Sequence, residues 1–109
     1  MAPLQEAPEL LKGVDVVTLV GYMTHNCDAS TIVHALHAGL TVEWLADASG
    51  AVPYANAAGA ASAEEIHRVF GVVFHSRFAA VTDTARWIAA VQAGEPLPRD
   101  SIVASNRRA

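Results

Sequence analysis

Residues 14–27 read Val14-Asp15-Val16-Val17-Thr18-Leu19-Val20-Gly21-Tyr22-Met23-Thr24-His25-Asn26-Cys27, and the predicted structure is built outward from them. The valine-rich run Val14–Val20 ends at a glycine, which is typical of a strand buried on both faces. A helix is predicted from about Cys27 to Ala38, because Gly39 is a favourable residue just past a helix end. Thr24 and Asn26 are both suitable residues for capping the start of this helix. The pattern therefore predicts a strand, a tight turn and a helix.

Cys27, which is the chain's one cysteine, is placed by this prediction on the first turn of a helix, just past the carboxyl end of a strand. Ligands and catalytic groups of open α/β sheets gather at that edge. Unpaired backbone N–H groups and the positive end of the helix dipole there favour a reactive thiolate. A lone cysteine is also commonly a small buried apolar residue. The residues alone leave both interpretations open.

The remaining elements repeat the alternation of strand and helix. Ser62 and Glu65 form the pattern of a capping box at the start of a helix. Trp44 and Trp87 are expected in the core, together with apolar positions of the later helices (Ile66, Val69, Phe70, Val73, Ile88 and Val91). The predicted elements are strands at Thr41–Leu45 and Phe78–Val81 and helices at Ala63–Phe74 and Thr84–Ala93, the last capped by Thr82 or Asp83, with a loop at residues 46–61. This order predicts an α/β fold with a parallel sheet and helices on both faces.

The segment Gly21-Tyr22-Met23-Thr24-His25-Asn26-Cys27 resembles the G-x-x-T-x-x-C segment of the isochorismatase-like cysteine hydrolases. That superfamily includes isochorismatases, nicotinamidases, N-carbamoylsarcosine amidases and ureidoacrylate amidohydrolases. The likeness continues through Ala38-Gly39-Leu40, Asp47-Ala48 and the strand Phe78-Ala79-Ala80-Val81. It covers about residues 13–91 and corresponds to the C-terminal half of the family's domain. Asp28 departs from the pattern, because the family usually has a small apolar residue there, often valine.

The resemblance implies a three-layer α-β-α, Rossmann-like, isochorismatase-like fold that is truncated at its N-terminus. It implies Cys27 as nucleophile and an oxyanion hole made by the backbone N–H groups of Met23 and Cys27. It also implies a cis peptide bond between Tyr22 and Met23. Tyr22 and His25 flank this turn and are expected to contact the substrate. The implied reaction is cleavage of a small amide or related C–N bond through a thioester on Cys27.

The family also uses an Asp base and a supporting Lys, which the resemblance assigns to the half that is absent here. The only lysine is Lys12, and it lies with Asp15 at the amino end of the first strand. A strand of six residues at about 3.3 Å each separates them from Cys27 by about 20 Å, too far for a general base. His25 is a candidate substitute base, although lining the mouth of the pocket is the favoured role. The alternative function is a non-catalytic fragment or assembly module.

Length and composition restrict the other possibilities. With 109 residues, the chain is one domain at most. Its net charge of −4 argues against the basic surface that nucleic-acid binding requires. We expect residues 1–8 to be a loop or disordered, 9–94 to form the partial domain with Glu9–Gly13 as a helix end, and 95–109 to form an exposed tail. No membrane span, secretory signal or disulfide is expected, so the predicted location is cytoplasmic. Three strands leave exposed sheet edges, which predicts a homo-oligomer.

Metal and cofactor sites are not expected. His34 and His37 lie three residues apart on one predicted helix and so can face the same way. No acidic residue completes a ligand set beside them, and a metal needs three or four convergent ligands. Asp47 is expected to tie down loop backbone rather than to act as an acid. The expected partner is a small-molecule substrate.

Overall fold

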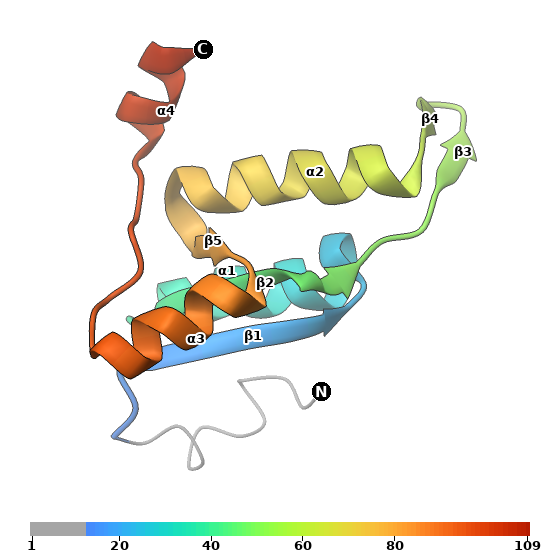
Figure 1. Cartoon of the computed structure of the whole chain (residues 1–109). Coiled ribbons are helices and arrows are strands. Elements are labelled where there is room, and N and C mark those ends of the chain that lie inside the picture. Colours follow the sequence, from blue (N-terminus) through green and yellow to red (C-terminus); the bar gives the residue numbers. More distant parts are fainter. Residues whose placement is uncertain (1–12) are drawn as a thin grey trace.

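The computed structural model describes residues 13–109, so Lys12 and the segments expected before Gly13 lie outside the described residues. The three strands of the main sheet and the helices between and after them come in the alternating order that the sequence predicts, and a hairpin and a C-terminal helix are additional (Figure 1). The strands are β1 (Val16–Tyr22), β2 (Thr41–Gly50), β3 (Tyr54–Asn56), β4 (Gly59–Ala61) and β5 (Ala80–Thr82). The helices are α1 (Ala29–His37), α2 (Ala63–Val73), α3 (Thr84–Ala93) and α4 (Ile102–Arg108), and two π-helical turns are η3 (Thr24–Asp28) and η4 (Phe74–Phe78).

The main sheet has the order β1-β2-β5, and both of its pairings are parallel. Within residues 13–109, β2 is the central strand and β1 pairs with β2 alone. The predicted parallel sheet is therefore confirmed. Both ends of β1 lie two residues later than predicted, at Val16–Tyr22 rather than Val14–Val20, and β5 begins two residues later, at Ala80.

The prediction of a loop at residues 46–61 was largely wrong. Strand β2 continues to Gly50, because Ser49 and Gly50 pair with Gly21 and Tyr22 after a register shift in the β1–β2 ladder. The chain then forms the antiparallel hairpin β3–β4. In its turn, the side-chain Oδ1 of Asn56 accepts a hydrogen bond from the N–H of Ala58 at 2.9 Å. Such an Asx turn replaces a backbone hydrogen bond and closes the hairpin.

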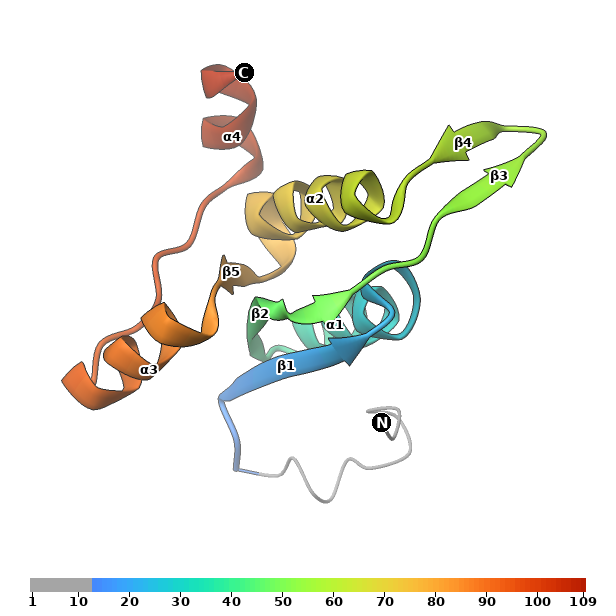
Figure 2. The same cartoon turned by 45° about the vertical axis from the view of Figure 1, so that its right-hand side comes forward.

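Helices lie on both faces of the sheet (Figures 1 and 2). Successive residues of a strand point to opposite faces. On one face, Trp44 of β2 joins a fully buried core cluster with residues of α1 and η4. On the other face, Glu43 accepts a hydrogen bond from the indole N–H of Trp87 in α3 at 3.1 Å. The three-layer arrangement of the prediction is therefore present.

The helix starts follow the predicted capping chemistry at two places. Ser62 Oγ accepts from the N–H of Glu65 at 3.1 Å, and the Glu65 carboxylate accepts from the N–H of Ser62 at 3.0 Å. The backbone N–H of Ser62 is the main cause that lowers the pKa of Glu65 from its ordinary value. Asp83 caps α3 by accepting from the N–H of Arg86 at 2.8 Å. The capping box and one of the two proposed caps of α3 are confirmed.

Several side chains expected in the core are exposed. Val69 and Val73 of α2 are 45% and 46% exposed, and Ile88 and Val91 of α3 are 45% and 59% exposed. These positions lie on helix faces that no other described element covers, so the prediction of their burial was wrong. Trp44 is fully buried, as expected, whereas Trp87 is half-buried.

The segment after Gly94 was expected to be an exposed tail, but part of it packs against the fold. Leu97 is 9% exposed, and the Arg99 guanidinium donates to the carbonyl oxygens of Val42 and Arg77 at 3.2 and 3.3 Å. Helix α4 follows, with its N-cap Ser101 accepting from the N–H of Ala104. Among residues 13–109, no helix combines the length and the apolar character needed to cross a bilayer.

Candidate active site

Cys27 lies just past the carboxyl end of β1 and is exposed, so it is not the small buried core residue of the alternative interpretation. The helical structure begins at Thr24, three residues before the predicted start, and Cys27 is the fourth residue of η3. The predicted capping by Thr24 or Asn26 was wrong. Met23 is the N-cap, without a side-chain bond, and its carbonyl oxygen accepts from the N–H groups of Asn26 and Asp28.

The peptide bond between Tyr22 and Met23 is cis, as the resemblance implies. The chain thus leaves β1, passes through this bond and enters the helical turn of Cys27 within a few residues. Backbone N–H groups in the first turn of a helix commonly have no partner inside the helix, although that of Asn26 donates here to the Met23 carbonyl oxygen. The turn therefore presents donors at the edge of the sheet where an acyl oxygen could bind.

No hydrogen bond joins the side chains of His25 and Cys27 within residues 13–109. Its Nε2 is hydrogen-bonded to the Tyr54 hydroxyl at 2.8 Å, and the two rings meet edge to face with centroids 5.1 Å apart. The ring of Phe70 lies 6.2 Å from that of His25. The residues of this cluster come from η3, the β3–β4 hairpin and α2. Sequence reasoning did not select Tyr54 as a candidate, although its place after a strand was a weak signal, and the structure brings it against His25. Tyr22, the other expected substrate contact, is 61% exposed at the end of β1.

Both ends of the turn that carries Cys27 are fully buried. Thr24 Oγ1 is hydrogen-bonded to Nδ1 of His67 at 2.8 Å, and the indole N–H of Trp44 donates to Oδ2 of Asp28 at 3.0 Å. Asp28, the residue that departs from the family pattern, is thus accommodated at 0% exposure. Its Oδ1 has no hydrogen-bond partner within residues 13–109.

Of the two charged groups expected to lie far from Cys27, only Asp15 belongs to the described residues. Asp15 is exposed and precedes β1, at the opposite end of the strand from Cys27. Within residues 13–109, no side chain hydrogen-bonds Cys27. His34 and His37 are exposed on the last turns of α1, and no group of three His, Cys, Asp or Glu residues in that range could hold a metal.

Asp47 holds backbone by hydrogen bonds, as expected, but from a strand rather than from a loop. It lies in β2. Its Oδ1 accepts hydrogen bonds from the backbone N–H and the hydroxyl of Thr84, at 2.9 and 2.8 Å. Asp47 thereby joins β2 to the first residue of α3.

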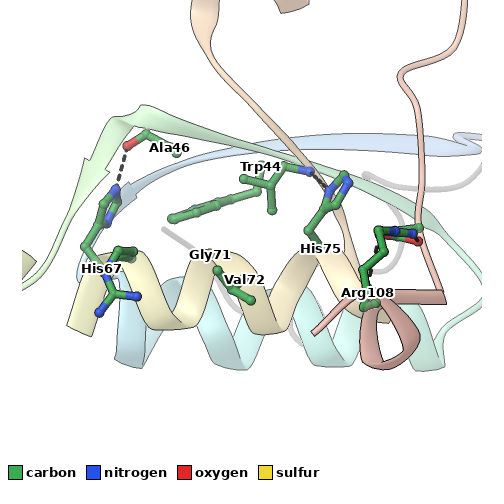
Figure 3. Close-up of a pocket in the computed structure, with 11 residues that line it drawn as sticks. Trp44, Ala46, His67, Gly71, Val72, His75 and Arg108 are labelled. Carbon is green, nitrogen blue, oxygen red and sulfur yellow. Dashed lines mark hydrogen bonds and ion pairs between the residues drawn. The ribbon is translucent and has the colours of Figure 1, made fainter. Parts of the chain in front are cut away.

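A cavity of about 550 Å³ lies between α2, the sheet and α4, and Cys27 does not line it (Figure 3). Trp44, Gly71 and Val72 form its apolar part, with His67 and Arg108 at its sides. Arg108 is already engaged in a bidentate pair with Asp100, at 2.7 and 2.8 Å. The chemistry implied by Cys27 thus belongs to the edge of the sheet and not to this cavity.

The parallel sheet, the helices on both of its faces and the exposed cysteine past the carboxyl end of β1 define an α/β protein with a candidate thiol site. A scan against protein-family models and a search of curated proteins each found no match. Solved structures do match. A candidate isochorismatase from Burkholderia xenovorans LB400 is 61% identical, with a TM-score of 0.89 over 96% of this chain and 50% of that chain.

Two further structures agree with this result. A cysteine hydrolase from Pseudomonas syringae pv. phaseolicola 1448A is 27% identical, with a TM-score of 0.74 over 83% of this chain and 43% of that one. An isochorismatase from Pseudomonas putida KT2440 is 29% identical, with a TM-score of 0.68 over 76% and 42%. The chain belongs to the isochorismatase-like cysteine hydrolase superfamily. It spans about half the length of the structures that it matches.

Proposed function

We propose that this chain supplies the nucleophile of a cysteine hydrolase that cleaves a small amide or a related C–N bond. The observation that carries the proposal is the exposed Cys27 on the helical turn that follows the carboxyl end of β1. The Cys27 thiolate attacks the carbonyl carbon, the C–N bond breaks, and the amine leaves with a proton. Water then hydrolyses the thioester, which releases the acid and restores the thiol.

The backbone N–H groups of Met23 and Cys27 are the proposed oxyanion hole. Fixed N–H donors stabilise the negative charge that develops on the acyl oxygen in the tetrahedral state. Tyr22 and His25 are the proposed substrate contacts, since they flank this turn. The bond between His25 and Tyr54 supports a role in shaping the mouth of the site over a role as base, because it engages the Nε2 atom.

These 109 residues alone are proposed to turn over substrate poorly. A thiol nucleophile needs a base within hydrogen-bond reach, and within residues 13–109 none contacts Cys27. The second candidate function is therefore a non-catalytic assembly module, which is favoured by a β1 edge that no strand within residues 13–109 pairs with. In either case we propose a cytoplasmic protein without cofactor, membrane or nucleic-acid partner, because a lone thiol and a net charge of −4 suit that setting.

Cys27 is expected to react with iodoacetamide at neutral pH faster than free cysteine does. The positive end of the helix dipole and the nearby N–H groups favour its thiolate form. Labelling that is quenched at a series of times and followed by mass spectrometry measures the alkylation rate. The same chain in denaturant is the control, because unfolding removes the helical turn. Equal rates for the folded and unfolded chains would contradict the proposed activation.

The isolated chain is expected to associate with a second copy of itself. In β1, just before it and in α3, apolar side chains are 39–59% exposed, namely Val14, Val16, Val20, Ile88 and Val91. The outer edge of β1 has no partner strand among the described residues, and such an edge beside an apolar surface is a template for pairing with another chain. Size-exclusion chromatography with light scattering should give at least a dimer mass. Val20→Lys should shift the protein toward monomer, whereas a monomeric wild-type chain with cooperative melting would overturn the proposal.

A further inference from the structure

The two ends of η3 are held by side chains that come from different elements. Thr24 and Asp28 are its first and last residues, and both are 0% exposed. Between them, Asn26 and Cys27 are exposed. Each buried end makes one side-chain hydrogen bond, Thr24 to His67 of α2 and Asp28 to Trp44 of β2. The turn that carries Cys27 is therefore anchored on both sides of the cysteine.

The direction of the first bond follows from its neighbours. Nε2 of His67 lies 2.9 Å from the carbonyl oxygen of Ala46, and a carbonyl can only accept (Figure 3). In a neutral imidazole, Nε2 then carries the proton and Nδ1 is an acceptor. The Thr24 hydroxyl consequently donates to His67. One imidazole thus joins the start of η3 to strand β2.

The two anchors also support each other. The rings of Trp44 and His67 lie 5.2 Å apart, and Trp44 packs edge to face on Phe74 at 5.1 Å. Trp44 and Ala46 are neighbours on the same face of β2, so both hydrogen bonds lead to the central strand. A side chain at Gly21 would bring its Cβ within 3.5 Å of Oδ1 of Asp28, which shows how closely β1 approaches this end of the turn.

We propose that Thr24, His67, Asp28 and Trp44 are positioning residues that fix the helical turn of Cys27. The inference deepens the proposed function and rests on Cys27 being its nucleophile. None of the four touches the reacting atoms. They keep the Cys27 sulfur and the N–H groups of the turn in one arrangement, so the loss of one anchor lowers the fraction of molecules that hold the reactive geometry.

The test compares Thr24→Val, which keeps the shape but loses the hydroxyl, with Thr24→Ser, which keeps the hydroxyl. We expect iodoacetamide labelling of Cys27 to slow by up to about fivefold in T24V, because the loss of one ordinary hydrogen bond changes the ratio of ordered to disordered turn by about that factor. T24S should label at close to the wild-type rate. Val81→Ala is the control for general destabilisation, because Val81 packs on the same core from β5 without contacting the turn. Equal slowing in V81A would overturn the inference.

A second variant guards against misfolding of T24V. His67→Leu breaks the same bond from a half-buried position on α2 and should slow labelling to a similar extent. In the wild-type chain, the indole N–H of Trp44 should exchange slowly with deuterated solvent, since it is buried and donates to Asp28. Wild-type labelling rates in folded T24V and H67L, or fast exchange of the Trp44 indole, would contradict the inference.

These readouts do not require turnover. If the chain hydrolyses no amide but T24V slows labelling, the proposed activity fails and the positioning role stands. If an active protein of full length carries T24V or H67L without any change in labelling, the positioning role fails and the activity stands.

Discussion

Replacement of Cys27 by alanine is expected to abolish amide hydrolysis in a hybrid in which this chain takes the place of the matched half of the Burkholderia xenovorans protein. The hybrid is reasonable because the two sequences are 61% identical over 96% of this chain. The other half would supply the Asp and Lys that the family resemblance implies. We expect kcat to fall at least about a thousandfold, because members of a nucleophilic catalytic group act as a unit. A coupled assay for released ammonia or amine measures it.

Ser30→Ala is the matched control, since Ser30 is exposed on the helix that follows Cys27 and is assigned no role in the site. It should leave kcat and KM unchanged. A Cys27→Ala hybrid that keeps the rate of the unsubstituted hybrid would show that another group performs the chemistry, and the assignment of the nucleophile would be wrong.

Replacement of Trp44 by alanine is expected to lower the free energy of unfolding by about 3–5 kcal/mol, the usual cost of a large buried aromatic. Trp44 is 0% exposed and contacts Phe74 and His67. The substitution also leaves the Asp28 carboxyl group without its donor in a buried place, which adds to the cost. Urea unfolding followed by circular dichroism measures the change.

Trp87→Phe provides the comparison. It keeps an aromatic ring on α3 but removes the hydrogen bonds to Thr18 and Glu43, so a loss of about 1 kcal/mol is expected. If W44A were no more destabilising than W87F, Trp44 would not be the centre of the core, and its proposed support of the Cys27 turn would lose its basis.

The parts of the fold that depend on local chemistry could be predicted from the sequence. The strand predicted from the valine-rich run, the Ser62–Glu65 capping box and the Asp83 cap each depend on a few neighbouring residues, and all three are present in the structure. The predicted burial of that strand on both faces was wrong, because Val16 and Val20 are 48% and 46% exposed. The resemblance placed the cis bond between Tyr22 and Met23, where it is found.

Long-range contacts account for what was missed. The extension of β2 to Gly50 has no local signal, because Ala46–Ser49 are weak strand formers that are held by pairing with the end of β1. The bonds from Thr24 to His67 and from Trp44 to Asp28 join residues 43 and 16 positions apart. The exposure of Val73 and Ile88 was missed because amphipathic spacing shows which face is apolar, but not whether another element covers it.

The central claim is that Cys27 is an acyl-accepting nucleophile. The most direct measurement is mass spectrometry of the 109-residue chain after incubation with a small activated phenyl ester, followed by peptide mapping. The account predicts one added acyl group, located on the peptide that contains Cys27 and absent from Cys27→Ala. Acylation at other residues only, or no acylation of a chain that is folded by circular dichroism, would contradict it.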